Sequence, residues 1–160
     1  PMLLMGFPAP SRAQARDRMA MTFLQVLLGG GPSSVLQETL KTQQRLVSDI
    51  SVNYEPNQAS GCIEVAMDTP PGQEFKAIQS LLQQIQQLRA QPVSQQKMQE
   101  LKGRVINSFN AALERAEVAT LSMGEEAAYQ SLGYYLNFPR LVDSMTPQDL
   151  QRVAIQYLNP

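Results

Sequence analysis

Two short stretches of alternating apolar and polar residues constrain the fold of this 160-residue chain more than any other feature. They cover residues 46–54 and 62–67, and the segment between them, 56–61, is rich in Pro, Asn, Ser and Gly. A period of two places successive side chains on opposite faces of a strand, and those four residue types favour turns. The pattern therefore predicts an antiparallel hairpin with one buried face. The side chains predicted to be buried are Leu46, Ile50, Val52, Tyr54, Ile63, Val65 and Met67, whereas Val47, Asp49, Ser51 and Asn53 are predicted to face solvent.

Helical spacing of apolar residues surrounds this hairpin. The predicted helices lie around residues 17–28, 35–40, 75–88, 98–123 and 147–158. On the first of them, Asp17 and Arg18 are expected on the solvated face. The fourth is expected to run from a cap at Ser94 as one helix of about seven turns, which Gly124 either ends or bends. Its alanines at 111, 112, 116 and 119 predict that another layer approaches closely there.

Both ends of the chain carry further signals. A short apolar strand over residues 2–7 precedes Pro8–Ala9–Pro10, which fixes an extended exit. Near the other end, Thr146, Pro147 and Asp149 form a typical capped helix start. The order of strand, helices, hairpin and helices predicts a single α+β domain over residues 1–160, with an antiparallel sheet and a layer of helices on one face.

Composition excludes several classes of function. The chain has no histidine and a single cysteine, Cys62, so it cannot build a His-based proton shuttle, a Ser-His or Cys-His nucleophile, or a typical zinc site. A net charge of −1 disfavours nucleic acid as a partner. No apolar run approaches the roughly 18 residues of a membrane span, so we expect a soluble chain. The compartment stays open, with a bacterial cytoplasm or periplasm both compatible.

Three stretches together resemble a known family. They are Gly6–Phe7–Pro8–Ala9–Pro10, the segment from Leu28 through Gly29–Gly30–Gly31–Pro32–Ser33–Ser34 to Leu36, and the segment Met145–Thr146–Pro147–Gln148–Asp149–Leu150–Gln151–Arg152–Val153–Ala154. In order and spacing, over nearly the whole chain, they are similar to the C-terminal-type, non-zinc domain of insulinase-like (pitrilysin-type, inverzincin) zinc metallopeptidases. The resemblance implies the α+β fold found in the domains of insulinase and of the mitochondrial processing peptidase.

The resemblance also implies where the chemistry takes place. Zinc in this family is held on another domain or subunit by an H-x-x-E-H helix, and this chain has no such motif. We therefore expect a non-catalytic domain, excised from a larger peptidase-like chain, whose partners are a zinc-bearing homologous domain or subunit and a peptide substrate. Because the family pattern continues into a further strand, the ending at Asn159–Pro160 is consistent with an excised piece.

The family pattern gives candidate substrate-binding residues. Where partner domains of the family carry an arginine and, seven residues later, a tyrosine, this chain has Lys41 and Ser48. Lysine keeps the charge without the planar fork of arginine, and serine is too short to replace a phenol, so a direct catalytic contribution is not expected. The corner at Gly29, Gly30 and Gly31 faces the peptide chamber in the family. From the residues alone it is better explained as a tight turn between helices.

Three interpretations remain open from the sequence. The first is a substrate-chamber domain of a zinc metalloendopeptidase, in which the edge of the hairpin pairs with an extended peptide. The alternative is a catalytically silent structural or assembly subunit of the same fold. The third is a self-associating α+β domain unrelated to peptidases, and a homo-oligomer is compatible with all three. The adjacent Glu125 and Glu126 are interpreted as a solvated helix end, and Cys62 as an inert thiol.

Overall fold

Three antiparallel strands form the sheet, in the order β1–β3–β2. The structure is a computed structural model and describes residues 1–159. The strands are β1 (Met2–Ala9), β2 (Asp49–Pro56) and β3 (Gly61–Asp68), and the predicted hairpin is confirmed as the β2–β3 pair. Val47 was predicted to lie on the solvent-facing side of the strand. It is buried instead, and it lies before β2, outside the alternation of the strand. Residue 46 also lies before β2, so the alternation begins only at Asp49.

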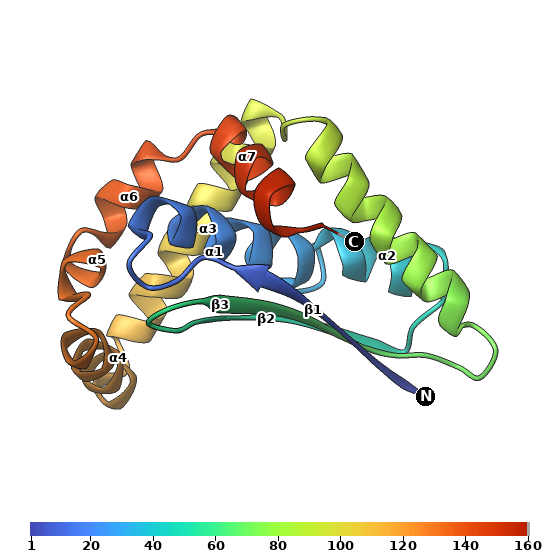
Figure 1. Cartoon of the computed structure of the whole chain (residues 1–160), viewed down its shortest axis with the longest axis horizontal. Coiled ribbons are helices and arrows are strands. Elements are labelled where there is room, and N and C mark those ends of the chain that lie inside the picture. The colour runs from blue at the N-terminus through green and yellow to red at the C-terminus, as the bar shows by residue number, and fades with distance from the viewer. Residues whose placement is uncertain (160) are drawn as a thin grey trace.

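Helices cover one face of this sheet (Figure 1). They are α1 (Ala15–Gly29), the π-helix η1 (Gln37–Gln43), α2 (Glu74–Ala90), α3 (Gln95–Leu113), α4 (Ala116–Ala128), α5 (Leu132–Leu136), α6 (Phe138–Ser144) and α7 (Pro147–Tyr157). This arrangement confirms the predicted α+β class with a single helical layer. Helices α4 and α5 extend past the hairpin end of the sheet (Figure 1).

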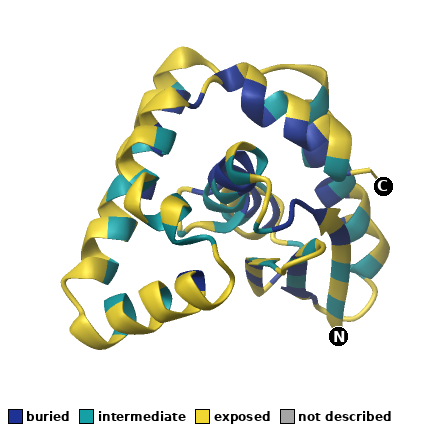
Figure 2. Cartoon of the chain, turned by 60° about the vertical axis from the view of Figure 1, so that its left-hand side comes forward, coloured by how far each residue is buried: buried dark blue, intermediate teal, exposed yellow. Residues whose placement is uncertain are grey.

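The core is centred on α1, which contacts β2, α3 and α7. Met19 and Phe23 are completely buried, and so is Met21 on another side of the helix. A helix that is apolar on most sides needs neighbours all round it, and Figure 2 shows buried residues concentrated on this central helix. The prediction that Arg18 faces solvent is wrong, since Arg18 is only 7% exposed.

The predicted seven-turn helix is interrupted. Ser94 caps it as expected by accepting from the Lys97 amide, but α3 ends at Leu113 and α4 begins at Ala116, with Arg115 between them in extended conformation. Gly124 lies inside α4 rather than at an end. The alanines predicted to meet a close layer are exposed or half-exposed. Apolar spacing alone could not reveal the break, because the direction of α4 depends on long-range contacts of Glu126 with Arg12 and Arg18.

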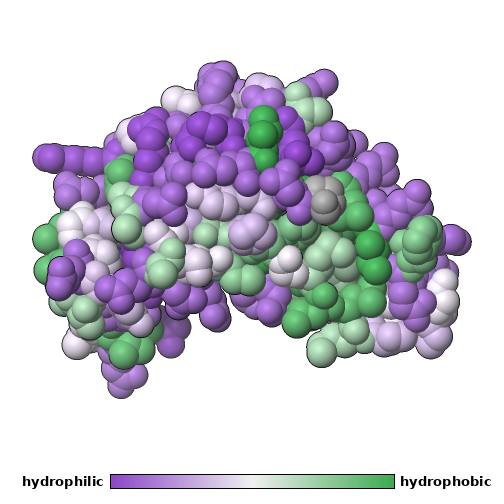
Figure 3. All heavy atoms as spheres, viewed as in Figure 1, coloured by the Kyte–Doolittle hydropathy of each residue, from purple (hydrophilic) through white to green (hydrophobic). Residues whose placement is uncertain are grey.

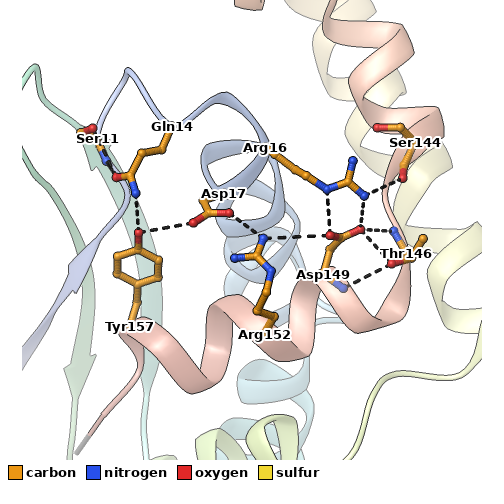
Figure 4. A network of polar contacts seen from close by, with 9 residues as sticks. All are labelled: Ser11, Gln14, Arg16, Asp17, Ser144, Thr146, Asp149, Arg152 and Tyr157. Carbon is orange, nitrogen blue, oxygen red and sulfur yellow. Dashed lines mark hydrogen bonds and ion pairs between the residues drawn. The ribbon is translucent and has the colours of Figure 1, made fainter.

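A polar network joins the start of α7 to α1 (Figure 4). Thr146 and Asp149 form the predicted capping box. The Asp149 carboxylate also accepts two hydrogen bonds from Arg16, at 2.9 Å from Nε and 2.7 Å from Nη2. A second ion pair lies one turn further along α7, where Arg152 Nη2 is 2.6 Å from Asp17 Oδ1. The network therefore fixes the angle at which α7 crosses α1.

Replacing Asp149 by asparagine should reduce stability by about 1–2 kcal/mol at pH 7, because the cap and the charged contacts to Arg16 weaken together. Burial opposes ionisation of Asp149, but hydrogen bonds from Arg16 and Thr146 outweigh it and hold the pKa of this carboxyl below its usual value. A lowered folded-state pKa contributes stability above the unfolded pKa, which is lost as the pH falls through the folded pKa. Urea unfolding should show that the difference in free energy of unfolding between wild type and Asp149→Asn becomes smaller below about pH 4. The exposed Asp143→Asn is the control, and a gap that does not change with pH would contradict the assignment.

Candidate substrate-facing surface

One face of the sheet carries no helical layer, and we call it the open face. Its side chains are Met2, Leu4, Gly6 and Pro8 from β1, Asp49, Ser51, Asn53 and Glu55 from β2, and Cys62, Glu64, Ala66 and Asp68 from β3. They stand in four cross-strand rows set by the register; Gly6, Glu64 and Asn53, for example, lie side by side. Each strand has eight residues, so the face is about 26 Å long.

The open face has an acidic part and an apolar part. Asp49 and Asp68 are direct cross-strand partners, as are Glu55 and Cys62, and these twelve positions include no lysine or arginine. On β1, Met2 and Leu4 are 73% and 60% exposed. Figure 3 shows apolar surface at the lower right of the view and an indentation in the lower outline of the molecule. The surface therefore suits a ligand with both cationic and apolar groups.

The outer edge of the hairpin, predicted to accept a peptide strand, is partly occupied. Gln37 Nε2 donates to the Ile50 carbonyl at 2.9 Å, and Gln25 Nε2 donates to the Val52 carbonyl at 3.2 Å. These two side chains come from η1 and α1 and satisfy edge groups that an added strand would need. The β2 edge is thus protected by the chain itself, and the open face remains as the accessible surface of this hairpin.

Lys41 and Ser48 lie at one end of the open face. Lys41, in the last turn of η1, places its Nζ 3.5 Å from Asp49 Oδ1. Ser48 Oγ donates to the Asp68 carbonyl at 3.2 Å. The structure therefore brings both residues to the end of the sheet where Asp49 and Asp68 meet. Lys41 is 42% exposed there and Asp49 70%.

The glycine corner lies on the helix side of the sheet. Gly29 ends α1 directly against β2, where an added Cβ would lie 2.5 Å from Val52 Cγ2. Gly31 has a φ of +112°, which glycine adopts without steric cost. The Gly30 carbonyl accepts a hydrogen bond from Arg104 of α3. The corner is a tight turn between helices, and its three residues do not join Lys41 and Ser48.

Sequence reasoning missed one charged cluster. The interpretation of Glu125–Glu126 as a solvated helix end holds for Glu125 but is wrong for Glu126, whose side chain is only 8% exposed. Arg18 Nη1 donates to Glu126 Oε2 at 2.9 Å, and Arg12 Nη1 lies 2.7 Å from Glu126 Oε1. Burial opposes ionisation of Glu126, but hydrogen bonds from Arg18 and Ser131 and the two arginine charges outweigh it and lower its pKa. No local motif marks a pair separated by 108 residues.

Zinc does not fit the residues of this chain. There is no histidine, and within residues 1–159 no three Cys, Asp or Glu side chains group together in a way that could hold a metal ion. No reaction step through a metal can be assigned to these side chains. In the same described part of the chain, none of the helices combines the length and apolar character required to cross a bilayer.

Comparisons with known proteins place this geometry in a family. Residues 1–105 match the model of the peptidase M16 inactive domain, whereas a search of curated protein sequences found no significant match. Similar solved structures include a protease from Helicobacter pylori, with a TM-score of 0.91 and 19% identity, and the peptidase M16 inactive domain from Pseudomonas fluorescens, with a TM-score of 0.84 and 19% identity. In each case 99% of this chain covers 38% of the other.

A third similar structure is the periplasmic protease PqqL from Escherichia coli, with a TM-score of 0.76 and 15% identity, in which 98% of this chain covers 17% of that protein. At such identities the likeness shows a shared fold. This chain spans well under half the length of these three proteins. The family match covers more than half of the chain and confirms the resemblance noted in the sequence, so this chain belongs to the peptidase M16 inactive-domain family.

Proposed function

We propose that this chain is the peptide-enclosing, non-catalytic domain of a zinc metalloendopeptidase, and that zinc and the hydrolytic step belong to another domain or subunit. Membership of the inactive-domain family and a sequence without histidine support this division of labour, and within residues 1–159 no three acidic or thiol side chains gather into a metal site. The open face is the surface that this domain presents to the peptide, and a zinc-bearing homologous half closes over it.

The observation that carries the proposal is the combination of a helix-free sheet face with unbalanced acidic charge. Glu55, Glu64 and Asp68 lie on two adjacent strands, and the exposed Met2 and Leu4 lie beside them on β1. An extended peptide of seven or eight residues matches the length of about 26 Å. Lysine or arginine side chains of such a peptide would meet the carboxylates, and its apolar side chains would cover β1. We therefore propose an extended cationic peptide as the bound form of the substrate.

Fluorescence anisotropy of labelled, unstructured peptides tests this function directly. The full chain should bind a peptide of alternating lysine and leucine, and bind a glutamate-for-lysine version of equal length at least tenfold more weakly at low salt. Binding should weaken as salt increases, and neither peptide should be cleaved. Equal affinity for both peptides would contradict the open face as the binding surface. Failure to bind any peptide would favour the silent assembly subunit instead.

Lys41 and Ser48 are proposed to border the bound peptide at one end. Because Lys41 lies 3.5 Å from Asp49, it partly neutralises that carboxylate. Lys41→Gln should therefore tighten binding of the cationic peptide about two- to threefold, corresponding to one exposed ion pair. Anisotropy titrations at two salt concentrations check this, with Lys76→Gln on the exposed side of α2 as the matched control. Weaker binding by Lys41→Gln would instead show that the ammonium contacts the peptide itself.

A further inference from the structure

Helix α4 is the part of the described structure least connected to the core. It has 13 residues, and Glu126 is the one buried residue that it contributes to residues 1–159. Leu121 and Met123 are 75% and 41% exposed. Among the described residues, the hydrophobic core and the partly buried side chains packed on it include no side chain of α4. Figure 2 shows the same contrast between the buried central helix and the largely exposed outer segment.

Ionic contacts replace apolar packing at this helix. Glu126 accepts from both Arg18 Nη groups, from Arg12 Nη1 at 2.7 Å and from Ser131 Oγ at 2.5 Å. The neighbouring Glu125 accepts from Arg12 Nη2 at 2.6 Å. Arg12 comes from the segment between β1 and α1, and Arg18 from α1, so both anchor the contacts outside α4. We call these contacts the Glu126 latch.

Non-helical backbone flanks α4 at both ends. At its start, Arg115 has extended dihedrals of −95° and 96° between two helices. Just after its end, Gln130 has a φ of +55°, which a residue with a side chain seldom adopts. Backbone changes at a few residues that end helices are the usual way in which a helix moves as a unit.

A cavity separates α4 from the end of the hairpin. Its volume is about 500 Å³, and its walls include Tyr54 and Asn57 of the hairpin, Arg12, and Ser122 and Glu125 of α4. Glu55 of the open face also lines it. Movement of α4 away from the sheet would therefore widen this cavity and extend the open face past the hairpin turn (Figure 1).

We propose that α4 is a hinged arm, closed over the hairpin end of the sheet by the Glu126 latch, and that breaking the latch opens the cavity. The arm needs no change in the sheet or in α1, because the hydrogen bonds and ion pairs that join α4 to α1 are those of the latch. A helix of 13 residues is marginal on its own in water, so its backbone hydrogen bonds loosen once it leaves the arginines. This inference does not depend on peptide binding.

Hydrogen exchange of the full chain tests the arm. In Glu126→Gln, α4 amides should exchange at least tenfold faster than in wild type, because charged hydrogen bonds are lost, while those of α1 and the three strands keep their rates. Glu117→Gln, an exposed change in the same helix, should leave α4 unchanged. Unchanged α4 rates in Glu126→Gln would overturn the proposal, and so would equal acceleration throughout the chain. If Glu126→Gln does not fold, Arg12→Gln removes part of the latch and should give the same local pattern.

Thiol labelling reports on the cavity separately. In a Cys62→Ser background, Ser122→Cys places a half-buried thiol in the cavity wall. Adding Glu126→Gln should raise its labelling rate at least tenfold, and adding Glu117→Gln should not change it. Equal labelling rates with and without the latch would show that the cavity does not open, and would overturn the hinged arm.

Discussion

Replacing Gly29 by alanine should destabilise the chain by about 2–3 kcal/mol, because the added methyl group has no space at the α1–β2 contact. The new Cβ would lie 2.5 Å and 2.6 Å from Val52 Cγ2 and Cβ, and 3.1 Å from the Val52 backbone nitrogen. Val52 is branched at Cβ and fixed in the centre of β2, so it cannot rotate away. The helix has to move off the sheet. Urea unfolding monitored by circular dichroism measures the loss.

Gly103 provides the control with the opposite sign. It lies in the middle of α3, and apart from its chain neighbours and the backbone of its own helix nothing lies within 4 Å of an added Cβ. Gly103→Ala should therefore stabilise the chain by about 0.5–1 kcal/mol, through higher helix propensity and a less flexible unfolded state. If Gly29→Ala were as well tolerated as Gly103→Ala, the close approach of α1 to β2 would be wrong, and with it the position of the open face.

Neutralising the open face should weaken binding of the lysine–leucine peptide about tenfold at low salt. The variant combines Glu55→Gln, Glu64→Gln and Asp68→Asn and leaves Asp49 with its Lys41 partner. Each exposed pair with the peptide contributes about 0.2–1 kcal/mol, so three of them correspond to roughly one order of magnitude in Kd. The difference should shrink with added salt, because the contacts are exposed to solvent. Anisotropy titrations at several ionic strengths measure both effects.

The matched control removes the same number of charges elsewhere. It combines Glu114→Gln, Glu117→Gln and Asp143→Asn, all exposed and all outside the sheet. Because its net charge equals that of the open-face variant, any difference between the two reflects position rather than total charge. Equal loss of affinity in both variants would mean that the peptide responds to the overall field of the protein, and would contradict a defined binding surface.

The parts of the fold that depend on neighbouring residues were predictable from the sequence. The alternation in residues 46–54 and 62–67 predicted the hairpin, and Thr146 with Asp149 predicted the start of α7, because both signals are local. Arg18 and Glu126 were both placed in solvent, since either residue alone looks like an ordinary surface charge. Only their meeting across 108 residues makes burial possible.

The candidate surface was predictable only in outline. Resemblance to the family identified Lys41 and Ser48, and the structure places them at the end of the open face where Asp49 and Asp68 meet. The hairpin edge seemed free because the sequence cannot show that Gln25 and Gln37 turn toward Val52 and Ile50. Glutamine has no pattern that distinguishes a solvated side chain from one that caps a strand edge. The glycine corner was interpreted correctly as a turn because its constraint is conformational and local.

The central claim is that the open face, rather than the helical surface, contacts the peptide. Site-specific photo-crosslinking tests it, with a benzophenone amino acid placed either at Asn53, in the middle of the open face, or at Gln87, on the exposed side of α2. Irradiation of the full chain with the labelled lysine–leucine peptide should give a covalent adduct at position 53 and none at position 87. An adduct at position 87 without one at position 53 would contradict the account.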